Sequence, residues 1–480
     1  MIPRRKQVRW ALFAFVLLLL LFWWRLLAFS AHNAPTMDET LHIYHGVLYW
    51  RLPPAQMLHN ITNNPPLVNG IIGLTTNLLA RPDIELPPGV MAHGDPVYAS
   101  QQFMWQVNAP GLQLVWAGRL AVMMLAVLLA ALIYNWSGRL FKSETAALFA
   151  LLLYTFDPNV LAHSGLATLD SGTAFFLVLA AYGVWAYWKR PFGRTFLLTG
   201  IALGLAVGAK FSGIVIFPAI LVTAVYRWWQ IGWKNVAWRR EVAVIISWGL
   251  MAFAVFLLTY RLDMVMLGRD FLWQQMHQFS GHPGFLLGEV SRAGWWYYFP
   301  VLFAVKTPLA ALFLVGCAIC LFLWRRLYDW QRLWLLVIAG GLFAMSMLTR
   351  VNIGYRYLLP ALPFLFIFSS QLAQPRYVAA KMGKVAVAFA ALGVVVSSIL
   401  IHPHYLAYFN QLAGGPDNGW QVVVDSNIDW GQDLAALGEY VVQRDGAAEI
   451  QGAWLSVVPP EVYGIELGDW YPPSPKAEQP

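Results

Sequence analysis

Two adjacent carboxylates, Asp38 and Glu39, follow the first apolar run of this 480-residue chain, and His42 and His45 come soon after them. A pair of carboxylates at a membrane surface could supply a general base and a second group that orients a substrate or binds a metal. The same two acids could instead solvate the end of a helix. Their spacing favours neither interpretation over the other.

Two further charged residues interrupt long apolar stretches, Asp170 within residues 161–187 and Lys210 within residues 197–228. Ionisable side chains are costly in lipid and are candidate functional residues by default. Asp170 is therefore a candidate catalytic residue, and pairing with Arg119 is the structural alternative. Lys210 could hold a phosphate. In its alternative role, the side chain extends to the membrane interface and keeps its charge in water.

Lys306 and Arg356 are two more cations that we expect near the outer surface. Together with Lys210 they break the bias that gathers basic residues on the cytoplasmic side of membrane proteins. Three cations against this bias indicate an anionic ligand on the outer side. Lys210, Arg356 and Lys306 are its candidate partners.

A metal site is the other chemistry to consider, because zinc needs three or four converging ligands. No pair of histidines here has a spacing that specifies such a site. Glu39, His42 and His282 are the candidate ligands, so a divalent metal stays open as a cofactor. Cys317 and Cys320 lie within one apolar run, where a disulfide or redox role is not expected.

The composition indicates that these residues are positioned by membrane-spanning helices. Hydrophobic residues make up 59% of the chain and charged residues 12%, about half the charged fraction of an ordinary soluble domain. Apolar runs long enough to cross ~30 Å of hydrocarbon, about 20 residues each, recur along the sequence. We therefore predict an all-α polytopic membrane protein. Its eleven expected spans are 10–29, 113–134, 145–160, 165–187, 195–209, 212–228, 241–260, 299–324, 333–349, 355–371 and 383–401.

Basic clusters fall in every second short loop, which is the positive-inside pattern. They account for the net charge of +8 without a nucleic-acid partner. The pattern predicts a cytoplasmic N-terminus and an extracytoplasmic C-terminus in an inner or plasma membrane. Since no small-residue cleavage site precedes the charged Arg25, we expect the first apolar run to be retained as a helix.

Three long segments are then expected outside, at 30–112, 261–298 and 402–480. Their apolar and aromatic content indicates short helices at the membrane surface, and one amphipathic helix is expected from Asp433 to Val442. We predict a transmembrane domain over 1–401, including the first two segments, and an external C-terminal segment over 402–480.

Several short stretches also occur in an order that is typical of a known family. They are Asp38-Glu39 with His42 and Gly46, Pro65-Pro66-Leu67, Asp157 to His163 with Thr168-Leu169-Asp170, Gly200 to Gly204, Lys210-Phe211-Ser212-Gly213, Gly281-His282-Pro283, Trp295 to Pro308, Arg356 to Pro360, Tyr408-Phe409-Asn410 and Asp425 to Asp433. In these the chain resembles the protein O-mannosyltransferases, glycosyltransferase family thirty-nine, and their bacterial relatives that use polyprenyl-phosphate sugars. The resemblance covers nearly the whole chain and implies the C-type glycosyltransferase membrane fold.

The same resemblance implies an activity. A sugar, expected to be a hexose such as mannose, would move from a polyprenyl-phosphate carrier to an acceptor hydroxyl outside the cytoplasm, with inversion. Asp38 would be the catalytic base, and Glu39 would orient the acceptor or a metal. Lys210 and Arg356, with Lys306 behind them, would hold the carrier phosphate while the isoprenoid tail lies between helices.

The acceptor stays open among protein, lipid and polysaccharide, because the chain lacks the large β-trefoil insertion of the eukaryotic family members and has only residues 261–298 in its place. The alternative function is a membrane transporter of an anionic solute, in which Asp170 and Lys210 would line the path. Transporters often contain paired halves with matching broken helices. This sequence shows no such repeat, and its long external segments favour an enzyme.

Overall fold

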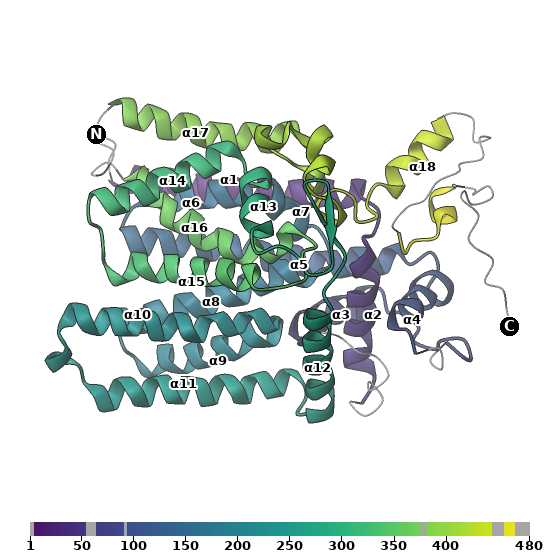
Figure 1. Cartoon of the computed structure of the whole chain (residues 1–480), viewed down its shortest axis with the longest axis horizontal. Coiled ribbons are helices and arrows are strands. Elements are labelled where there is room, and N and C mark those ends of the chain that lie inside the picture. Colours follow the sequence, from purple (N-terminus) through teal and green to yellow (C-terminus); the bar gives the residue numbers. More distant parts are fainter. Residues whose placement is uncertain are drawn as a thin grey trace.

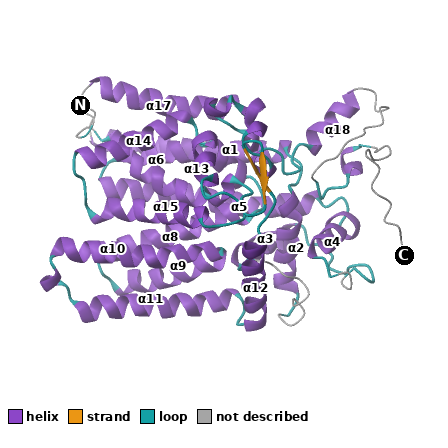
Figure 2. Cartoon of the chain, viewed as in Figure 1, coloured by secondary structure: helices purple, strands orange, loops and turns teal. Residues whose placement is uncertain are grey.

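The computed structural model describes residues 4–53, 64–90, 94–374, 377, 381–443 and 456–465. Within these ranges the chain is largely helical, and its strands form one short antiparallel hairpin (Figure 2). The helices are α1 (Arg4–His32), α2 (Met37–Arg51), α3 (Leu67–Leu79), α4 (Pro96–Gln102), α5 (Leu112–Phe141), α6 (Glu144–Thr155), α7 (Pro158–Ser164), α8 (Leu169–Lys189), α9 (Gly193–Ala209), α10 (Ile216–Ile231), α11 (Trp238–Thr259), α12 (Met264–Ser280), α13 (Tyr298–Lys306), α14 (Leu309–Trp324), α15 (Trp330–Met347), α16 (Leu362–Ser369), α17 (Lys381–Leu400) and α18 (Leu434–Gln443). The strands are β1 (Gly284–Leu286) and β2 (Glu289–Ser291).

Seven helical segments in the described part of the chain are long and apolar enough to cross a bilayer. They are α1, α5, α8, α10 with the preceding 3-10 turn η4 (Phe211–Val215), α11, α15 and α17. The helix pairs α6–α7 and α13–α14 are bent by 65° and 112° at short breaks, and they raise the number to nine if each pair counts as one span. The prediction of an all-α polytopic membrane protein is confirmed.

The expected number of eleven spans is not confirmed. The segment predicted at 195–209 is α9, an apolar helix of only 17 residues. The segment predicted at 355–371 contains the eight-residue α16 with 3-10 turns on both sides. Pro360 and Pro363 explain this difference, because proline lacks the N–H group that a continuous helix needs and is tolerated mainly in a first turn.

Two glycines allow α2 and α3 to cross in backbone contact. A Cβ atom added to Gly73 would lie 1.8 Å from the carbonyl oxygen of Gly46, and one added to Gly46 would lie 2.1 Å from the carbonyl oxygen of Asn69. Small residues at helix crossings let backbones approach closely in membrane proteins. The crossing fixes the position of α2, which carries Asp38 and Glu39.

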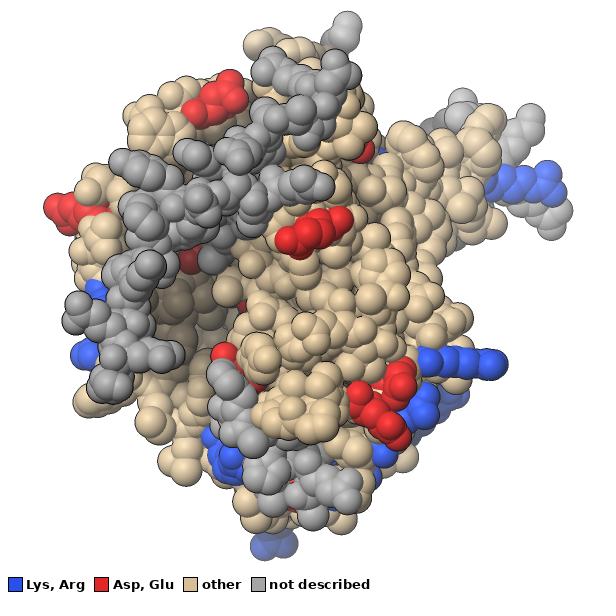
Figure 3. Space-filling view, turned by 90° about the vertical axis from the view of Figure 1, so that its right-hand side faces the viewer, with Lys and Arg blue, Asp and Glu red and all other residues tan. Residues whose placement is uncertain are grey.

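The segments that were expected outside the membrane gather at one end of the helix bundle (Figure 1). There α2, α3 and α12 run across the direction of the long helices, beside α4 and the hairpin. Viewed from this end, the face is hollowed on one side (Figure 3). The turns between α10 and α11 and between α14 and α15, which carry basic residues, lie at the opposite end. The side of the membrane that each end faces stays a prediction from these charges.

The described part of the C-terminal segment packs against the bundle. The side-chain amide of Asn410 donates to the carbonyl oxygens of Ala304 and Thr307. The backbone N–H of Met37, the first residue of α2, donates to the carbonyl oxygen of Trp430 at 3.0 Å. The expected amphipathic helix is present as α18. The segment thus supports the start of α2, whereas the division into domains at residue 401 stays a prediction.

Candidate active site

Four of the residues selected from the sequence form two ion pairs at the end of the bundle that carries α2 and α12. Nη1 of Arg356 lies 2.6 Å from Oδ2 of Asp38, and Nζ of Lys210 lies 2.9 Å from Oδ1 of Asp170. Asp170 is almost completely buried, whereas the side chain of Asp38 is 34% exposed. We call these four residues the charge cluster. Asp38 is its accessible carboxylate.

Helix ends place three members of the charge cluster. Asp38 and Asp170 lie in the first turns of α2 and α8, where the positive end of the helix dipole stabilises an acid. Lys210 ends α9 in an extended conformation, and the 3-10 turn η4 follows it. Gly213 makes this break possible, because a Cβ atom there would lie 2.2 Å from the carbonyl oxygen of Ala206.

Arg356 is the centre of the charge cluster and lies in the 3-10 turn η6 (Tyr355–Tyr357). Its guanidinium lies over the ring of Trp430, 4.3 Å from the ring centroid. Burial alone would lower the pKa of Arg356, but the charges of Asp38 and Asp170 outweigh it and raise the pKa above the ordinary value. The guanidinium is therefore a permanent positive charge, and its buried Nε has no hydrogen-bond partner within the described ranges.

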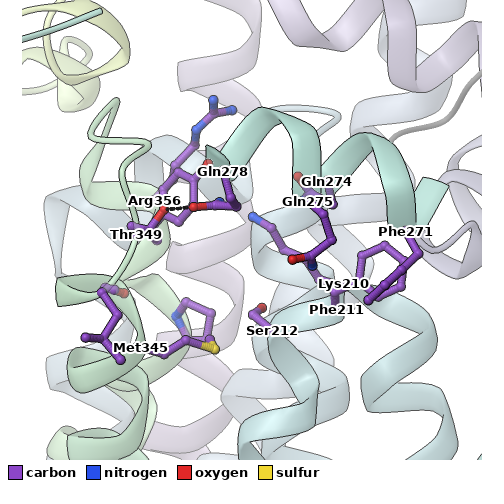
Figure 4. Close-up of a pocket in the computed structure, with 14 residues that line it drawn as sticks. Lys210, Phe211, Ser212, Phe271, Gln274, Gln275, Gln278, Met345, Thr349 and Arg356 are labelled. Atoms are coloured by element: carbon purple, nitrogen blue, oxygen red, sulfur yellow. Dashed lines mark hydrogen bonds between the residues drawn. The ribbon is translucent and has the colours of Figure 1, made fainter. Parts of the chain in front are cut away.

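A pocket of about 420 Å³ opens beside Lys210 and Arg356. The remaining wall is neutral, and α12 contributes three glutamines to it (Figure 4). One of these, Gln278, accepts a hydrogen bond from the hydroxyl of Thr349. The other lining residues are Phe211, Ser212, Phe271, Gln274, Gln275, Met345, Ser346, Leu348, Tyr357 and Pro360. Among the described residues that line this wall, the two cations are thus the only charged side chains.

A second cavity, of about 710 Å³, adjoins the first and is almost entirely apolar. The two cavities share Phe211, Phe271 and Gln275 in their walls. The rest of the second wall comes from the neighbouring helices, as Val207, Ile214, Phe217, Gly249, Ala252, Phe253, Phe256, Met264, Leu267 and Gly268. A cationic pocket and a hydrocarbon-lined cavity therefore lie side by side.

Glu39 does not belong to the charge cluster, although it follows Asp38 in the chain. It is fully buried, and both of its oxygens lie 2.8 Å from donors of the Arg119 guanidinium. The backbone N–H groups of Thr36 and Ala167 donate to it as well. Burial would raise the pKa of Glu39, but the charge and hydrogen bonds of Arg119 and the backbone donors lower it below the ordinary value. This geometry is that of a structural ion pair, and it leaves Asp170 to pair with Lys210 instead of Arg119.

The candidate metal ligands are not assembled into a site. Within the described ranges no three His, Cys, Asp or Glu side chains are placed to hold a metal ion. Glu39 is bound to Arg119, and the ring of His282 lies at a tilt against that of His277, with ring centroids 5.7 Å apart. His42 is buried near the charge cluster, and burial lowers its pKa more than the charges of Asp38 and Asp170 raise it. We therefore interpret His42 as an uncharged side chain that packs beside the charge cluster.

Lys306 is separated from the pocket as well. Its side chain is buried, and its Nζ donates to the carbonyl oxygens of Leu406 and Asn427. It also lies over the ring of Phe409, 4.6 Å from the centroid. Lys306 therefore joins α13 to the C-terminal segment, and this placement offers no charge to a ligand in the pocket.

Solved structures of other proteins share this arrangement over most of the chain. ArnT from Cupriavidus metallidurans in the apo state matches it with a TM-score of 0.55 and 16% sequence identity, over 96% of this chain and 86% of that protein. ArnT bound to undecaprenyl phosphate matches with a TM-score of 0.51 and 17% identity, over 94% and 74% of the two chains. This chain has the C-type glycosyltransferase fold.

An oligosaccharyltransferase from Archaeoglobus fulgidus, tethered with an acceptor peptide, has the fold in common too. Its TM-score is 0.52 at 13% identity, over 96% of this chain and 59% of that one.

A family model described as dolichyl-phosphate-mannose-protein mannosyltransferase matches residues 99–266. The matched region contains Asp170 and Lys210, while Asp38 and Arg356 lie outside it. No curated protein matches the sequence. The fold that the resemblance implied is confirmed.

The uncharged residues of the candidate active site were not predicted from the sequence. Gln274, Gln275 and Gln278 occupy one side of α12 at helical spacing, but nothing in the sequence specifies which side of the helix meets the pocket. Trp430 lies in a stretch that was noted for its resemblance, yet its contact with Arg356 crosses 74 positions and depends on the C-terminal segment folding back. Such residues are found only from the tertiary structure.

Proposed function

We propose that this chain is a glycosyltransferase that moves a hexose from a polyprenyl-phosphate carrier to an acceptor hydroxyl. The observation that carries the proposal is the junction of the cationic pocket with the apolar cavity. A polyprenyl phosphate joins an anionic head to a hydrocarbon tail, and such a molecule needs both surfaces next to each other. ArnT, which has the same fold, is known with undecaprenyl phosphate bound, and this supports the proposal.

Lys210 and Arg356 would hold the carrier phosphate. Lys210 uses one ammonium N–H on Asp170, so two of its three donors stay available. Arg356 binds Asp38 through Nη1 and keeps Nε without a partner among the described residues. Fixed cations that face a developing negative charge stabilise the transition state in a site that excludes water. The two cations would therefore favour departure of the phosphate.

Asp38 would be the general base. The acceptor oxygen forms a bond to the anomeric carbon, its proton passes to the Asp38 carboxylate, and the bond from that carbon to the phosphate oxygen breaks with its electron pair on the phosphate. Arg356 holds Oδ2 of Asp38 and leaves Oδ1 for the proton. A single displacement of this kind inverts the anomeric configuration. Asp170, buried against Lys210, would position that lysine and would not contact the sugar.

The pocket wall favours a neutral hexose, such as mannose, over an amino sugar. A sugar ammonium would need an unpaired carboxylate, whereas Asp38 and Asp170 are both paired with cations. The amides of Gln274, Gln275 and Gln278 can each donate and accept hydrogen bonds, as sugar hydroxyls require. The acceptor stays open among protein, lipid and polysaccharide.

The test uses full-length protein in lipid nanodiscs with radiolabelled polyprenyl-phosphate mannose, glucose and aminoarabinose. Cell-envelope extract provides the acceptors, and mass spectrometry of glycoproteins, glycolipids and polysaccharides identifies the product. We expect transfer of a neutral hexose. Preferential transfer of aminoarabinose would overturn the choice of sugar. Absence of any transfer, together with uptake of an anionic solute into proteoliposomes, would favour a transporter instead.

A further inference from the structure

A second polar cavity lies at the opposite end of the bundle from the charge cluster. It has a volume of about 660 Å³ and shares no lining residue with either cavity of the candidate active site. The end of α5, the start of α6, the end of α8 and the start of α15 meet around it. Lys142, Lys189 and Arg332 bring three cations to its wall.

The charges in this wall do not balance. Asp329 is the single acid among the described lining residues, and it is bound to Arg332. Arg332 is further fixed by the side-chain oxygen of Gln371 at 3.1 Å and by the hydroxyl of Tyr377 at 2.9 Å. Lys142 and Lys189 are exposed and have no ion pair within the described ranges. The cavity thus keeps two positive charges without an ion-pair partner among the described residues, beside a neutral Arg332–Asp329 pair.

Helix-end electrostatics explain each lysine separately but not their convergence. Lys189 ends α8 and Lys142 caps α5, and the helix dipole stabilises a cation at a helix C-terminus. The same cavity, however, also receives the N-termini of α6 and α15, capped by Ser143 and Asp329. Those ends carry partial positive charge, which offsets the partial negative charge of the C-termini of α5 and α8 and leaves the charge of the two lysines unbalanced. An anion is the ligand that lowers the energy of this arrangement.

We propose that this cavity is a binding site for a phosphate-bearing anion. Lys142 and Lys189 would neutralise the phosphate from the wall of the cavity. Basic pockets between membrane helices on the cytoplasmic side are suited to phospholipid head groups. A soluble phosphate compound would offer the same chemistry. The proposal is independent of the transfer reaction, because no residue of the charge cluster takes part.

The experiment measures thermal unfolding of the full-length protein in phosphatidylcholine nanodiscs under three conditions, namely without addition, with cardiolipin in the bilayer, and with inorganic pyrophosphate in solution. The test variant is Lys142→Gln/Lys189→Gln. The matched control is Arg194→Gln/Lys234→Gln, which removes two exposed basic residues that do not line the cavity. Native mass spectrometry of the same samples counts bound lipid.

We expect at least one probe, at about a hundredfold excess over its Kd, to raise the Tm of the wild type and of the control by about 2–3 °C. The test variant should lose this shift. A response to cardiolipin alone identifies a lipid head group, and a response to pyrophosphate alone identifies a soluble ligand. Equal responses in wild type and test variant, or no response in either, would overturn the proposal.

Discussion

Arg356 and Asp38 are 318 positions apart in the sequence, and a 2.6 Å hydrogen bond joins Nη1 of the arginine to Oδ2 of the acid. The bond connects the two halves of the proposed reaction, because the cation that faces the leaving phosphate also orients the base. Trp430 reinforces this connection. Its ring covers Arg356, and its carbonyl oxygen accepts from the N–H of Met37, the residue before Asp38.

The first prediction concerns Asp38→Asn. The amide keeps an oxygen that can accept from Arg356 but cannot take a proton, so transfer should fall by about 10²–10⁴-fold, the usual contribution of a general base. Donor binding and Tm should change little. Asp417→Asn, at an exposed acid of the C-terminal segment, is the control. Activity of the Asp38 variant within threefold of the wild type would remove this residue from the reaction.

The sequence was enough to predict the long helices of the fold but not the number of membrane spans. Apolar runs predicted the long helices because burial in lipid requires continuous hydrophobic stretches. The bends between α6 and α7 and between α13 and α14 lie at Asp157-Pro158 and Thr307-Pro308, and the angle at a proline is set by tertiary packing. The span count therefore could not be obtained from hydropathy alone.

In the candidate active site too, the sequence identified some residues correctly and others wrongly. Charge inside apolar stretches was enough to select Asp170 and Lys210, and adjacency to the first helix selected Asp38. Adjacency also selected Glu39, yet neighbouring residues in a helix point about 100° apart, so one carboxylate faces Arg356 and the other Arg119. Lys306 was selected for its charge, but its partners Leu406 and Asn427 are backbone carbonyls that no sequence pattern identifies.

The second prediction separates Glu39 from the reaction. Removing one partner of a buried ion pair leaves an uncompensated charge and costs about 3–5 kcal/mol. Glu39→Gln should therefore lower the Tm strongly, because Arg119 keeps its charge, whereas the fraction that stays folded should retain donor affinity. Glu144→Gln, at an exposed acid in the first turn of α6, is the control. Unchanged Tm with lost transfer would return Glu39 to an acceptor- or metal-binding role.

The third prediction is a pH dependence of stability from His45. Burial lowers its pKa to about 3, and the neighbouring His42 adds to this shift. The unfolded chain titrates near 6.5, so at lower pH the unfolded state binds a proton that the folded state does not, and stability falls as the pH falls. We expect the Tm to decline between about pH 7 and about pH 5.

The variant His45→Phe should show a smaller decline over the same interval, whatever its Tm at neutral pH. His404→Gln, at an exposed histidine, is the control. The measurement is thermal unfolding across the pH series in one detergent. An equal slope in wild type and His45→Phe would show that His45 does not titrate differently in the folded and unfolded states.

The fourth prediction concerns orientation in the membrane. Basic residues at the end of the bundle opposite the charge cluster predict that this end is cytoplasmic. In a variant without Cys317 and Cys320, a cysteine at Gln443 should react with a membrane-impermeant thiol reagent in spheroplasts. A cysteine at Ser143 should react only after the membrane is permeabilised. The opposite pattern would invert the topology and place the candidate active site in the cytoplasm.

The last prediction tests the phosphate site through the Lys210–Asp170 pair. Lys210 contacts Asp170 at 2.9 Å and lines the pocket. It could therefore stabilise the fold by pairing with Asp170, bind the carrier phosphate, or do both. Lys210→Ala leaves the buried Asp170 unpaired and should lower the Tm. If Lys210 also binds the carrier, the same variant should weaken donor binding by about 1.5–3 kcal/mol, the range for a hydrogen bond to a charged group.

The double variant Asp170→Asn/Lys210→Ala separates the two contributions, because it removes the unpaired charge without restoring the cation. Its Tm should recover most of the loss, and the coupling between the two changes is measured by the double-mutant cycle. Its donor affinity should stay as low as that of Lys210→Ala. Donor titration and melting of the same purified variants provide both quantities. If the double variant regained wild-type affinity together with stability, Lys210 would be only the partner of Asp170, and Arg356 alone would be left to bind the phosphate.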